Sequence, residues 1–478
     1  MDYLRFDEKN RLIVVSNRIP YNITRINNKI SYKKSVGGLV TALDPILKKT
    51  GGLWIGWSGL SGKSKFIEKK IGIPGDNDNS YDLKIVNLSS NEIIDYYRGF
   101  SNRTIWPLFH GFILQSYFDS DYWKSYQTTN KKFANEVFSQ VTSEDIIWVH
   151  DYHLALVPGM LRSKNDNLKI LYFLHIPFPN YETLRVLPWA SKILEGILGS
   201  NIVGFQTRRD AINFLACCRE ILGLEVDFYK FMVRLGNRFI HVINLPISID
   251  YNYFADFANK KETIALENKI KKSLKNIRIV LSVERLDYTK GLKERIRAID
   301  YFFETYPEYK GKVIFLHIAV PSRSKIEEYI TLKREIDEAT GKINGKYSQE
   351  MWSPITYIYK SLSQEKLIAY YKVSDICLIT SLRDGMNLIA KEYVSCKLDG
   401  SGVLILSKFA GAADEMKERS VTINPYDIEE IANKIKLALE FGEKEKVQNM
   451  RMLQEQVKQN DVFEWCKSFL NYFYLNQT

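Results

Sequence analysis

Charged and polar side chains that could do chemistry directly follow several apolar, β-branched runs of the sequence. Arg18 follows one run, Asp151 follows a second, and His175 follows a third. In a parallel α/β sheet the carboxyl ends of the strands meet at one edge, and ligands bind beyond that edge. Further candidates of this kind are Arg285, Lys290, Arg323 and the segment 383–387. The set is rich in cations and poor in carboxylates, which favours phosphorylated ligands.

Two pairs of cations suit phosphate chemistry. Arg285 and Lys290 stand where a predicted strand ends and a predicted helix begins, so they could clamp a diphosphate whose charge grows as a bond breaks. Arg18 and Arg323 each carry a guanidinium, which can grip two oxygens of a phosphate monoester. Taken singly, each of these residues is also consistent with an ordinary exposed cation.

A single acid and a histidine lie among these cations. Asp151 could hold sugar hydroxyls or stabilise a developing positive charge. His150 and His153 flank it, but their spacing lacks the helical register of a zinc site, so we expect no metal. His175 precedes two prolines and is consistent either with a site residue or with a buried core histidine.

Glycines and aromatic residues complete the candidates. Gly37 and Gly38 precede a predicted helix, where a flexible turn lets backbone N–H groups approach a phosphate. Aromatic rings can line a sugar pocket, although at this density they usually serve the core. The aromatic candidates are Trp54, Trp57, Tyr97 and Trp106.

The elements that must position these residues alternate between strands and helices. Several apolar runs are apolar on both faces, which predicts parallel strands covered by helices on both sides. The predicted strands are 11–17, 145–151, 168–176, 201–207, 239–247, 278–284, 312–320, 355–361, 376–381 and 402–409. The predicted amphipathic helices are 208–222, 291–306, 323–340 and 427–441, and helices are also predicted at 39–47 and in the polar segment 443–458.

The length of 478 residues is large for one hydrophobic core and favours two large domains. A polar, lysine-rich stretch at 248–275 follows the predicted strand 239–247 and separates two α/β halves. We therefore expect a first domain at 1–246 and a second at 247–458. A terminal helix at 459–478 carries an aromatic stripe that needs a partner, and packing back onto the first domain would supply one.

The composition is that of a soluble globular protein, with 45% hydrophobic and 26% charged residues. The net charge of +11 favours anionic partners, but the basic residues are scattered doublets, which argues against nucleic acid. The apolar run 170–178 is interrupted by His175 and Pro177, so we expect neither a signal peptide nor a membrane span. Five cysteines without a CxxC pair indicate a reduced, cytoplasmic protein.

An ordered set of motifs covers nearly the whole chain. They are VVSNRIP (14–20), VGGL (36–39), GGLWIGWSG (51–59), WPLFH (106–110), IIWVHDYHL (146–154), FLHIPFP (173–179), GFQT (204–207), SVERLDYTKG (282–291), INGKY (343–347), LRDGMNLIAKEYV (382–394) and FAGAADE (409–415). Together they resemble the trehalose-6-phosphate synthases, a family of retaining glycosyltransferases. The resemblance implies an α/β GT-B fold in which two Rossmann-like parallel-sheet domains face a central cleft, the first binding the acceptor and the second the nucleotide sugar.

The same resemblance implies an activity and its residues. Glucose would pass from UDP-glucose to the anomeric hydroxyl of glucose 6-phosphate, giving α,α-trehalose 6-phosphate with retention of configuration. The implied acceptor residues are Arg18, Trp54, Tyr97, Trp106, Asp151 and Arg323. The implied donor residues are Gly37, Gly38, His175, Arg285, Lys290, Asp384, Gly385, Met386, Asn387, Leu388, Ile389, Ala390, Lys391 and Glu392. Of these, Asp151, His175, Arg285, Lys290 and Asp384 are the expected catalytic set.

The implied reaction needs no metal and no cofactor, because Arg285 and Lys290 would act on the leaving group. No DxDGT-type phosphatase motif follows the synthase motifs, so we expect no dephosphorylation of the product. Leu362 stands where some relatives place an aromatic residue near the base, which leaves the donor nucleotide open. Glucosylglycerol-phosphate synthase and a catalytically silent, sugar-phosphate-sensing relative are the alternatives. A homo-oligomer also stays open, whereas we expect no nucleic-acid or membrane partner.

Overall fold

The chain divides into two compact α/β units. Unit 1 comprises residues 1–247 and 462–478, and unit 2 comprises residues 248–461. The computed structural model describes residues 10–26, 29–34, 37–62, 70–74, 80–274 and 276–476. Within these ranges no helix is both long and apolar enough to cross a membrane. The predicted class, an α/β protein with two parallel-sheet domains, is confirmed.

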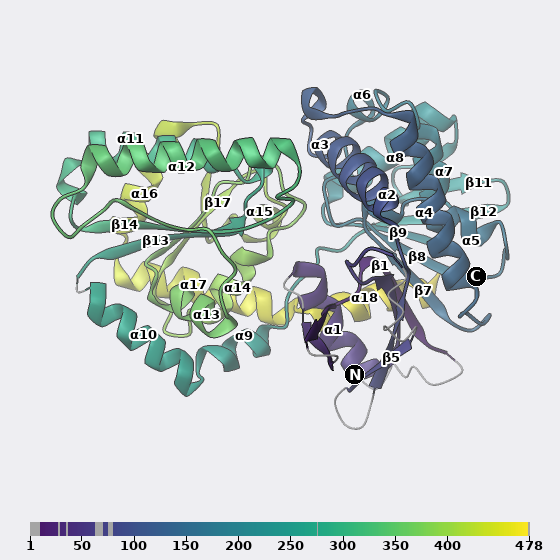
Figure 1. Cartoon of the computed structure of the whole chain (residues 1–478), viewed down its shortest axis with the longest axis horizontal. Coiled ribbons are helices and arrows are strands. Elements are labelled where there is room, and N and C mark those ends of the chain that lie inside the picture. The colour runs from purple at the N-terminus through teal and green to yellow at the C-terminus, as the bar shows by residue number, and fades with distance from the viewer. Residues whose placement is uncertain are drawn as a thin grey trace. The chain divides into compact units, whose positions relative to one another are not determined.

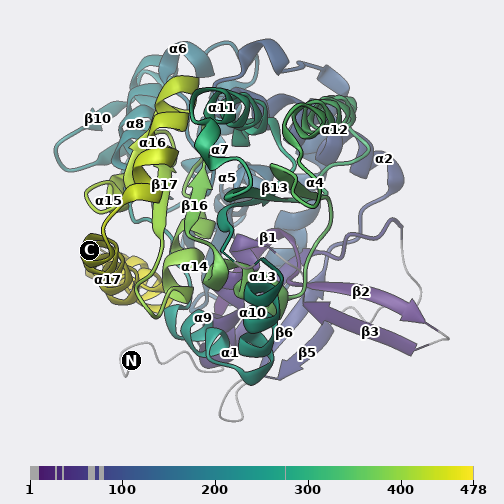
Figure 2. The same cartoon turned by 90° about the vertical axis from the view of Figure 1, so that its left-hand side faces the viewer.

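Unit 1 is built on a ten-stranded sheet in the order β10-β11-β12-β9-β8-β7-β1-β4-β6-β5. The inner strands are parallel, whereas β5, β11 and β10 are antiparallel to their neighbours. The strands are β1 (Leu12–Arg18), β4 (Gly52–Trp57), β5 (Lys70–Pro74), β6 (Ser80–Ile85), β7 (Ile146–His150), β8 (Lys169–Phe173), β9 (Ile202–Phe205), β10 (Glu225–Asp227), β11 (Met232–Leu235) and β12 (Arg238–Asn244). A separate hairpin pairs β2 (Tyr21–Ile26) with β3 (Lys29–Lys34), as Figure 2 shows.

The helices of unit 1 include one unusual segment. Residues Ile93–Ile105 form a π-helix, η1, which is a rare geometry and carries Tyr97. The other helices are α1 (Gly38–Thr50), α2 (Ser90–Glu92), α3 (Trp106–Phe109), α4 (Ser120–Phe138), α5 (Val157–Arg162), α6 (Tyr181–Leu184), α7 (Ala190–Ile197), α8 (Arg208–Leu222) and α18 (Val462–Leu475), with short 3₁₀ turns at Ile113–Gln115 and Tyr152–Leu154.

The terminal helix α18 packs against the sheet of unit 1 and runs beside α1 (Figure 1). The Trp465 ring stacks on Trp148 of β7 at 4.9 Å between centroids, and Phe469 lies 4.8 Å from the same ring. A Cβ added at Gly204 of β9 would lie 2.4 Å from the Phe469 ring. Glycine is therefore required at position 204, because the aromatic ring occupies the space of a side chain.

Unit 2 is a six-stranded parallel sheet in the order β15-β14-β13-β16-β17-β18. Its strands are β13 (Arg278–Arg285), β14 (Val313–Val320), β15 (Ile355–Ile358), β16 (Ile376–Ile379), β17 (Val403–Ser407) and β18 (Val421–Ile423). Its helices are α9 (Tyr251–Ala258), α10 (Lys261–Leu274), α11 (Leu292–Thr305), α12 (Glu327–Tyr347), α13 (Gln364–Val373), α14 (Leu388–Cys396), α15 (Ala412–Met416), α16 (Ile428–Glu440) and α17 (Glu443–Gln459), with 3₁₀ turns at Tyr288–Lys290 and Pro307–Tyr309.

Helices cover both faces of the unit 2 sheet. Figures 1 and 2 show α11 and α12 on one face and α10, α13 and α14 on the other. Val280, Phe315 and Ile405 of three strands pack with Phe302 of α11 in one buried cluster. Strands enclosed in this way must be apolar on both faces, as the sequence predicted.

Candidate active site

Arg18 ends β1 of unit 1 and is partly buried. Its Nη2 lies 3.4 Å from the Ser58 carbonyl oxygen and 3.4 Å from Asn22 Oδ1, and its guanidinium lies 4.9 Å from the Trp57 ring centroid. Within the described ranges no carboxylate forms an ion pair with it. Burial lowers the pKa of Arg18. A cation held in this way favours an anionic ligand, because an anion would offset the cost of burying the charge.

Gly59 makes room for this guanidinium. Its φ is +90°, and a Cβ there would lie 2.1 Å from Arg18 Nη2. Any other residue would displace the arginine and would also adopt a strained backbone. Gly59 is the last residue of the GGLWIGWSG motif, so the structure gives a local reason for that glycine.

Two tryptophans of β4 point to opposite faces of the sheet, because side chains alternate along a strand. Trp54 is 0% exposed and donates its Nε1–H to Ser16 Oγ at 2.8 Å. Its side chain is therefore enclosed in the core of unit 1, and its expected contact with the acceptor stays a prediction. Trp57 instead contacts Arg18 and lies 5.5 Å from the Tyr97 ring. Both tryptophans were candidates from the sequence, and the alternation of side chains along β4 distinguishes the one in the core from the one beside Arg18.

Tyr97 and Trp106 come from the π-helix and the helix that follows it. The Tyr97 ring is partly exposed and stacks 5.8 Å from His153. Trp106 is 5% exposed and packs 4.2 Å from the His110 ring. Tyr97 thus joins the cluster around Arg18 through Trp57, whereas Trp106 presents little surface to a ligand.

Asp151 follows β7 with φ +74° and ψ 166°, a backbone conformation that only glycine adopts without strain. Its Oδ1 accepts a hydrogen bond from the His175 N–H at 3.4 Å, and its Oδ2 lies 3.8 Å from His153 Nδ1. Strain of this kind costs about 1–3 kcal/mol and concentrates at functional sites. The structure therefore brings the predicted acid and the predicted histidine together.

The His175 ring contacts a second histidine. Its Nε2 lies 3.1 Å from His150 Nδ1, and its Nδ1 lies 3.4 Å from Gln206 Nε2. Burial lowers the pKa of His175 to about 3, and burial together with the neighbouring His175 lowers that of His150. Both rings are neutral near pH 7. Only the place of Gln206 in the GFQT motif could have drawn attention to it before the structure was known.

Gly37 and Gly38 begin α1, as predicted. Both are exposed, and the Gly37 carbonyl accepts hydrogen bonds from the Thr41 N–H at 2.9 Å and from Thr41 Oγ1 at 3.0 Å. The first N–H groups of a helix have no partner within the helix, so this end of α1 suits an anion. Val36 of the same motif lies outside the described residues.

In unit 2 the cations Arg285 and Lys290 flank the turn after β13. The Arg285 Nη1 lies 3.5 Å from Ser322 Oγ. The Lys290 Nζ forms a 2.6 Å ion pair with Asp384 Oδ2, and both side chains are more than four-fifths buried. Asp384 Oδ2 also accepts from Ser381 Oγ at 3.1 Å. The predicted lysine and aspartate are thus brought into direct contact.

Arg323 follows β14 with φ +49°. Its Nη1 forms a 2.8 Å ion pair with Asp287 Oδ2, and its side chain is 5% exposed against 0% for Asp287. The Tyr329 hydroxyl donates to the same Oδ2 at 3.1 Å. Burial alone would raise the pKa of Asp287, but the charges of Arg323, Arg285 and Lys290 outweigh burial and lower it. The sequence analysis selected Arg323 as a candidate but missed its carboxylate partner.

The segment 384–392, which is expected to bind the donor, forms the turn before α14 and the first five residues of that helix. Asn387 caps the helix by accepting from the Ala390 N–H at 3.2 Å and donates from Nδ2 to Asp384 Oδ2 at 3.1 Å. Glu392 accepts from the Tyr371 hydroxyl at 2.8 Å, and burial raises its pKa to about 7.

The Lys391 side chain is held inside unit 2. It is 2% exposed and forms a 2.8 Å ion pair with Glu415, and the expected part of Lys391 in donor binding stays a prediction. Gly385 and Met386 are likewise buried, whereas Leu388 and Ile389 are partly exposed. A Cβ at Gly411 would lie 1.9 Å from the Gly385 carbonyl, which shows how closely the FAGAADE turn packs on this segment.

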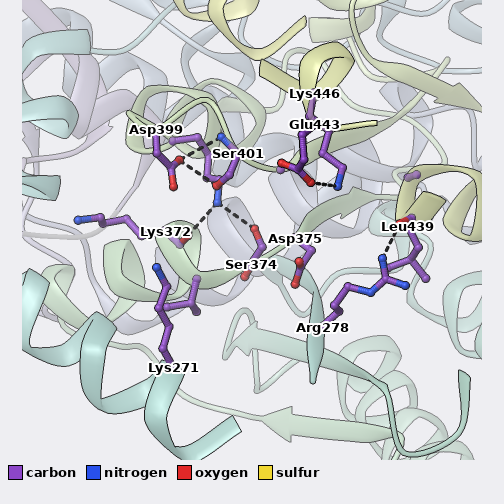
Figure 3. A pocket seen from close by; sticks show the side chains of 14 residues that line it. Lys271, Arg278, Lys372, Ser374, Asp375, Asp399, Ser401, Leu439, Glu443 and Lys446 are labelled. Atoms are coloured by element: carbon purple, nitrogen blue, oxygen red, sulfur yellow. Dashed lines mark hydrogen bonds and ion pairs between the residues drawn. The ribbon is translucent and has the colours of Figure 1, made fainter. Parts of the chain in front are cut away.

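A cavity of about 290 Å³ lies at the opposite edge of the unit 2 sheet, where β13 begins (Figure 3). Its cations have local roles. Lys397 donates to the carbonyls of Lys372 at 2.8 Å and Ser374 at 3.1 Å, and Arg278 donates to the Leu439 carbonyl. These contacts satisfy the carboxyl ends of helices, where cations are favourable. The cavity is therefore separate from the candidate residues at the carboxyl ends of the strands.

The two sheets and the cations beyond their strand ends define a glycosyltransferase of the two-domain GT-B class, as its structural neighbours show. The chain belongs to glycosyltransferase family 20, whose model matches residues 10–475.

Two curated relatives illustrate the similarity. The chain is 38% identical to the Candida albicans alpha,alpha-trehalose-phosphate synthase [UDP-forming], covering 97% of each chain. It is 38% identical to the bifunctional trehalose-6-phosphate synthase/phosphatase of Thermoproteus tenax, where 96% of this chain spans 63% of that protein.

Two solved structures are similar over almost their whole length. An E. coli structure bound with UDP-2-fluoro glucose has a TM-score of 0.88 and 34% identity, covering 97% of this chain and 98% of that one. A Burkholderia xenovorans alpha,alpha-trehalose-phosphate synthase (UDP-forming) in complex with glucose-6-phosphate has a TM-score of 0.87 and 32% identity, covering 97% and 100%.

Proposed function

We propose that this glycosyltransferase transfers glucose from UDP-glucose to glucose 6-phosphate, forming α,α-trehalose 6-phosphate with retention. The observation that carries the proposal is Arg18, a partly buried cation for which the described residues supply no carboxylate. A phosphate monoester on the acceptor supplies the missing negative charge. The names and ligands of the relatives support the same substrates.

Within this proposal, unit 1 recognises the acceptor through Arg18, Tyr97 and Asp151, and Arg323 is a further phosphate ligand. Asp287 then holds Arg323 in place while the guanidinium binds phosphate with its remaining N–H groups. A guanidinium has five N–H donors in a fixed plane, so one arginine can serve a carboxylate and a phosphate at the same time.

The donor diphosphate is bound by Arg285 and Lys290, whose charges stabilise the UDP leaving group as the glycosidic bond breaks. Asp384 orients Lys290 through the 2.6 Å ion pair. Glu392 accepts hydrogen bonds from the ribose hydroxyls, and the first N–H groups of α14 face the same ligand. No carboxylate is assigned as a nucleophile. The acceptor hydroxyl attacks on the face that UDP leaves, and the departing phosphate oxygen takes its proton.

We also propose that the reaction needs no metal ion, since Arg285 and Lys290 neutralise the diphosphate. Within the described ranges no group of three or more His, Cys, Asp or Glu side chains is placed to bind a metal. We propose a reducing, cytoplasmic location for the chain, because its five cysteines are free and buried.

The decisive experiment incubates the purified protein with UDP-glucose and, separately, glucose 6-phosphate, glycerol 3-phosphate or glucose. Products are separated by chromatography, and their anomeric configuration is read by NMR. From glucose 6-phosphate we expect trehalose 6-phosphate in which both anomeric centres of the one glycosidic linkage are α, and from glucose we expect very little product. Preferential use of glycerol 3-phosphate would establish a glucosylglycerol-phosphate synthase instead, and UDP binding without transfer would indicate a silent relative. ADP-glucose and GDP-glucose in parallel reactions identify the preferred nucleotide.

A further inference from the structure

Gln206 is a buried amide in unit 1 whose two polar atoms serve different partners. It lies directly after β9 and is 3% exposed. Its Oε1 accepts a hydrogen bond from the Ile247 N–H at 2.8 Å. A backbone N–H can only donate, so this contact fixes which end of the amide is oxygen. The other end, Nε2, is 3.4 Å from His175 Nδ1 and must donate to it.

This assignment determines the proton positions on two histidines. His175 Nδ1 accepts from Gln206, so the neutral His175 ring carries its proton on Nε2. That Nε2–H donates to His150 Nδ1 at 3.1 Å. The His150 proton is then on its own Nε2, a buried atom that has no hydrogen-bond partner among the residues that the structure describes. Both nitrogens of the His175 ring are thus satisfied inside the protein, and the ring has no free site from which to exchange a proton with a substrate.

The chain of contacts continues from His175 to Asp151. The His175 backbone N–H donates to Asp151 Oδ1 at 3.4 Å, and Asp151 holds a strained backbone. At its other end the chain reaches Ile247, the last residue of unit 1 before the polypeptide enters unit 2. Trp465 of α18 donates from Nε1 to the Leu245 carbonyl at 3.1 Å and packs 6.5 Å from the His175 ring.

We propose that Gln206 is a positioning residue that holds His175 as the Nε2–H tautomer and thereby fixes Asp151, while the same amide anchors the Ile247 peptide. The effect on turnover rests on the proposed function, in which His175 and Asp151 surround the sugars. The tautomer itself does not rest on it. Gln206 touches no substrate, and its influence passes through His175.

Two substitutions distinguish the contact of Gln206 with His175 from its contact with the Ile247 peptide. Gln206→Met keeps the volume and removes both hydrogen bonds. Gln206→Glu keeps an oxygen for the Ile247 N–H but turns a second oxygen toward His175 Nδ1, which favours a proton on Nδ1 and so reverses the tautomer. The exposed Gln127→Glu on α4 makes the same change of charge and serves as the control.

The first measurement is ¹⁵N NMR of the resting enzyme labelled at histidine, with the His175 signals assigned from a His175→Asn variant. We expect a protonated Nε2 and an unprotonated Nδ1 on His175 in the wild type and in Gln127→Glu, and the reverse pattern in Gln206→Glu. A wild-type ring protonated on Nδ1, or an unchanged pattern in Gln206→Glu, would overturn the proposal. This readout needs no substrate and stands even if the proposed reaction fails.

The second measurement is steady-state kinetics with UDP-glucose and glucose 6-phosphate. For both Gln206 variants we expect kcat to fall about tenfold, the Kd of UDP to stay unchanged and Gln127→Glu to match the wild type. One lost hydrogen bond of ordinary strength corresponds to a change of that order. Unchanged kcat in Gln206→Met, with the protein folded as judged by circular dichroism, would show that the network does not position the site.

Discussion

Asp287 and Arg323 form a buried ion pair whose disruption should destabilise unit 2 strongly. The carboxylate is 0% exposed and the guanidinium 5% exposed, so Asp287→Asn leaves a charge buried without its partner. Removing one member of a buried pair costs about 3–5 kcal/mol. Asparagine retains the side-chain shape and an oxygen for the Thr289 N–H, which bonds Asp287 Oδ1 at 3.1 Å, so we expect the lower end of that range.

The control is an exposed pair on the same unit. Asp337 pairs with Lys333 on α12, with side chains 43% and 35% exposed. Exposed pairs contribute about 0–1 kcal/mol, because solvent screens them. For a domain of 150–250 residues, 1 kcal/mol shifts Tm by about 2–4 °C. The expected shifts are therefore roughly 6–12 °C for Asp287→Asn and less than about 4 °C for Asp337→Asn.

The assay is differential scanning calorimetry of the whole chain, in which two units permit two transitions. The pH dependence supplies a second check. Because the pKa of Asp287 is lowered in the folded protein, its stabilisation is complete above the ordinary aspartate pKa of about 4 and is lost as the pH falls through the lowered value. The difference in Tm between the wild type and Asp287→Asn should be constant from pH 6 to 8 and should become smaller in acid. Equal Tm shifts for the two variants would refute this reasoning.

Four further predictions concern the site. Arg18→Ala should raise the KM for glucose 6-phosphate roughly tenfold to hundredfold, because a charge-assisted contact of about 1.5–3 kcal/mol is lost. The Kd of UDP should stay unchanged, and a defect confined to UDP binding would assign this arginine to the donor. Lys290→Ala should lower kcat/KM roughly hundredfold or more, whereas Asp384→Asn, which keeps the lysine charge, should lower kcat/KM by a smaller factor. Near-normal turnover of Lys290→Ala would exclude the leaving-group role. Burial raises the pKa of Glu392 to about 7, so folding favours its protonated form and its ionisation weakens the fold as the pH rises toward 7. UDP affinity should nevertheless rise from pH 6 to 8 as the carboxylate forms, and calorimetric titration of Glu392→Gln should show no such rise. Activity measured in excess EDTA should persist, and a loss restored by a divalent ion would contradict the metal-free proposal.

Hydrophobic patterning was enough to predict most inner strands and several helices. The prediction for 208–222 matches α8 at both ends, because Thr207 caps the start by accepting from the Asp210 N–H and Gly223 ends the helix in the left-handed conformation. The prediction for 323–340 was wrong in its limits. Helix α12 runs from Glu327 to Tyr347, since Arg323 adopts a positive φ that a helix does not allow.

Other elements carried too little local signal. Strands β10 and β11 have only three and four residues and few buried side chains, and the π-helix differs from an α-helix in hydrogen bonding rather than in composition. The candidate site residues likewise fall into those that the sequence could predict and those that it could not. Its cations follow strands and could be found from the sequence, whereas the Asp287 partner of Arg323 and the Gln206 partner of His175 come from tertiary contacts that join distant segments.

Unit 1 is assembled from two segments that are separated by the whole of unit 2. During synthesis on the ribosome, β7 and β8 emerge long before Trp465 and Phe469 can cover Trp148. Unit 2, which is continuous in sequence, can complete its core while an apolar face of unit 1 still awaits α18. Helix α18, which is translated after all of unit 2, thus completes a sheet that began to form before unit 2, so truncation of α18 would leave nascent unit 1 with an open aromatic surface that chaperones and proteases recognise.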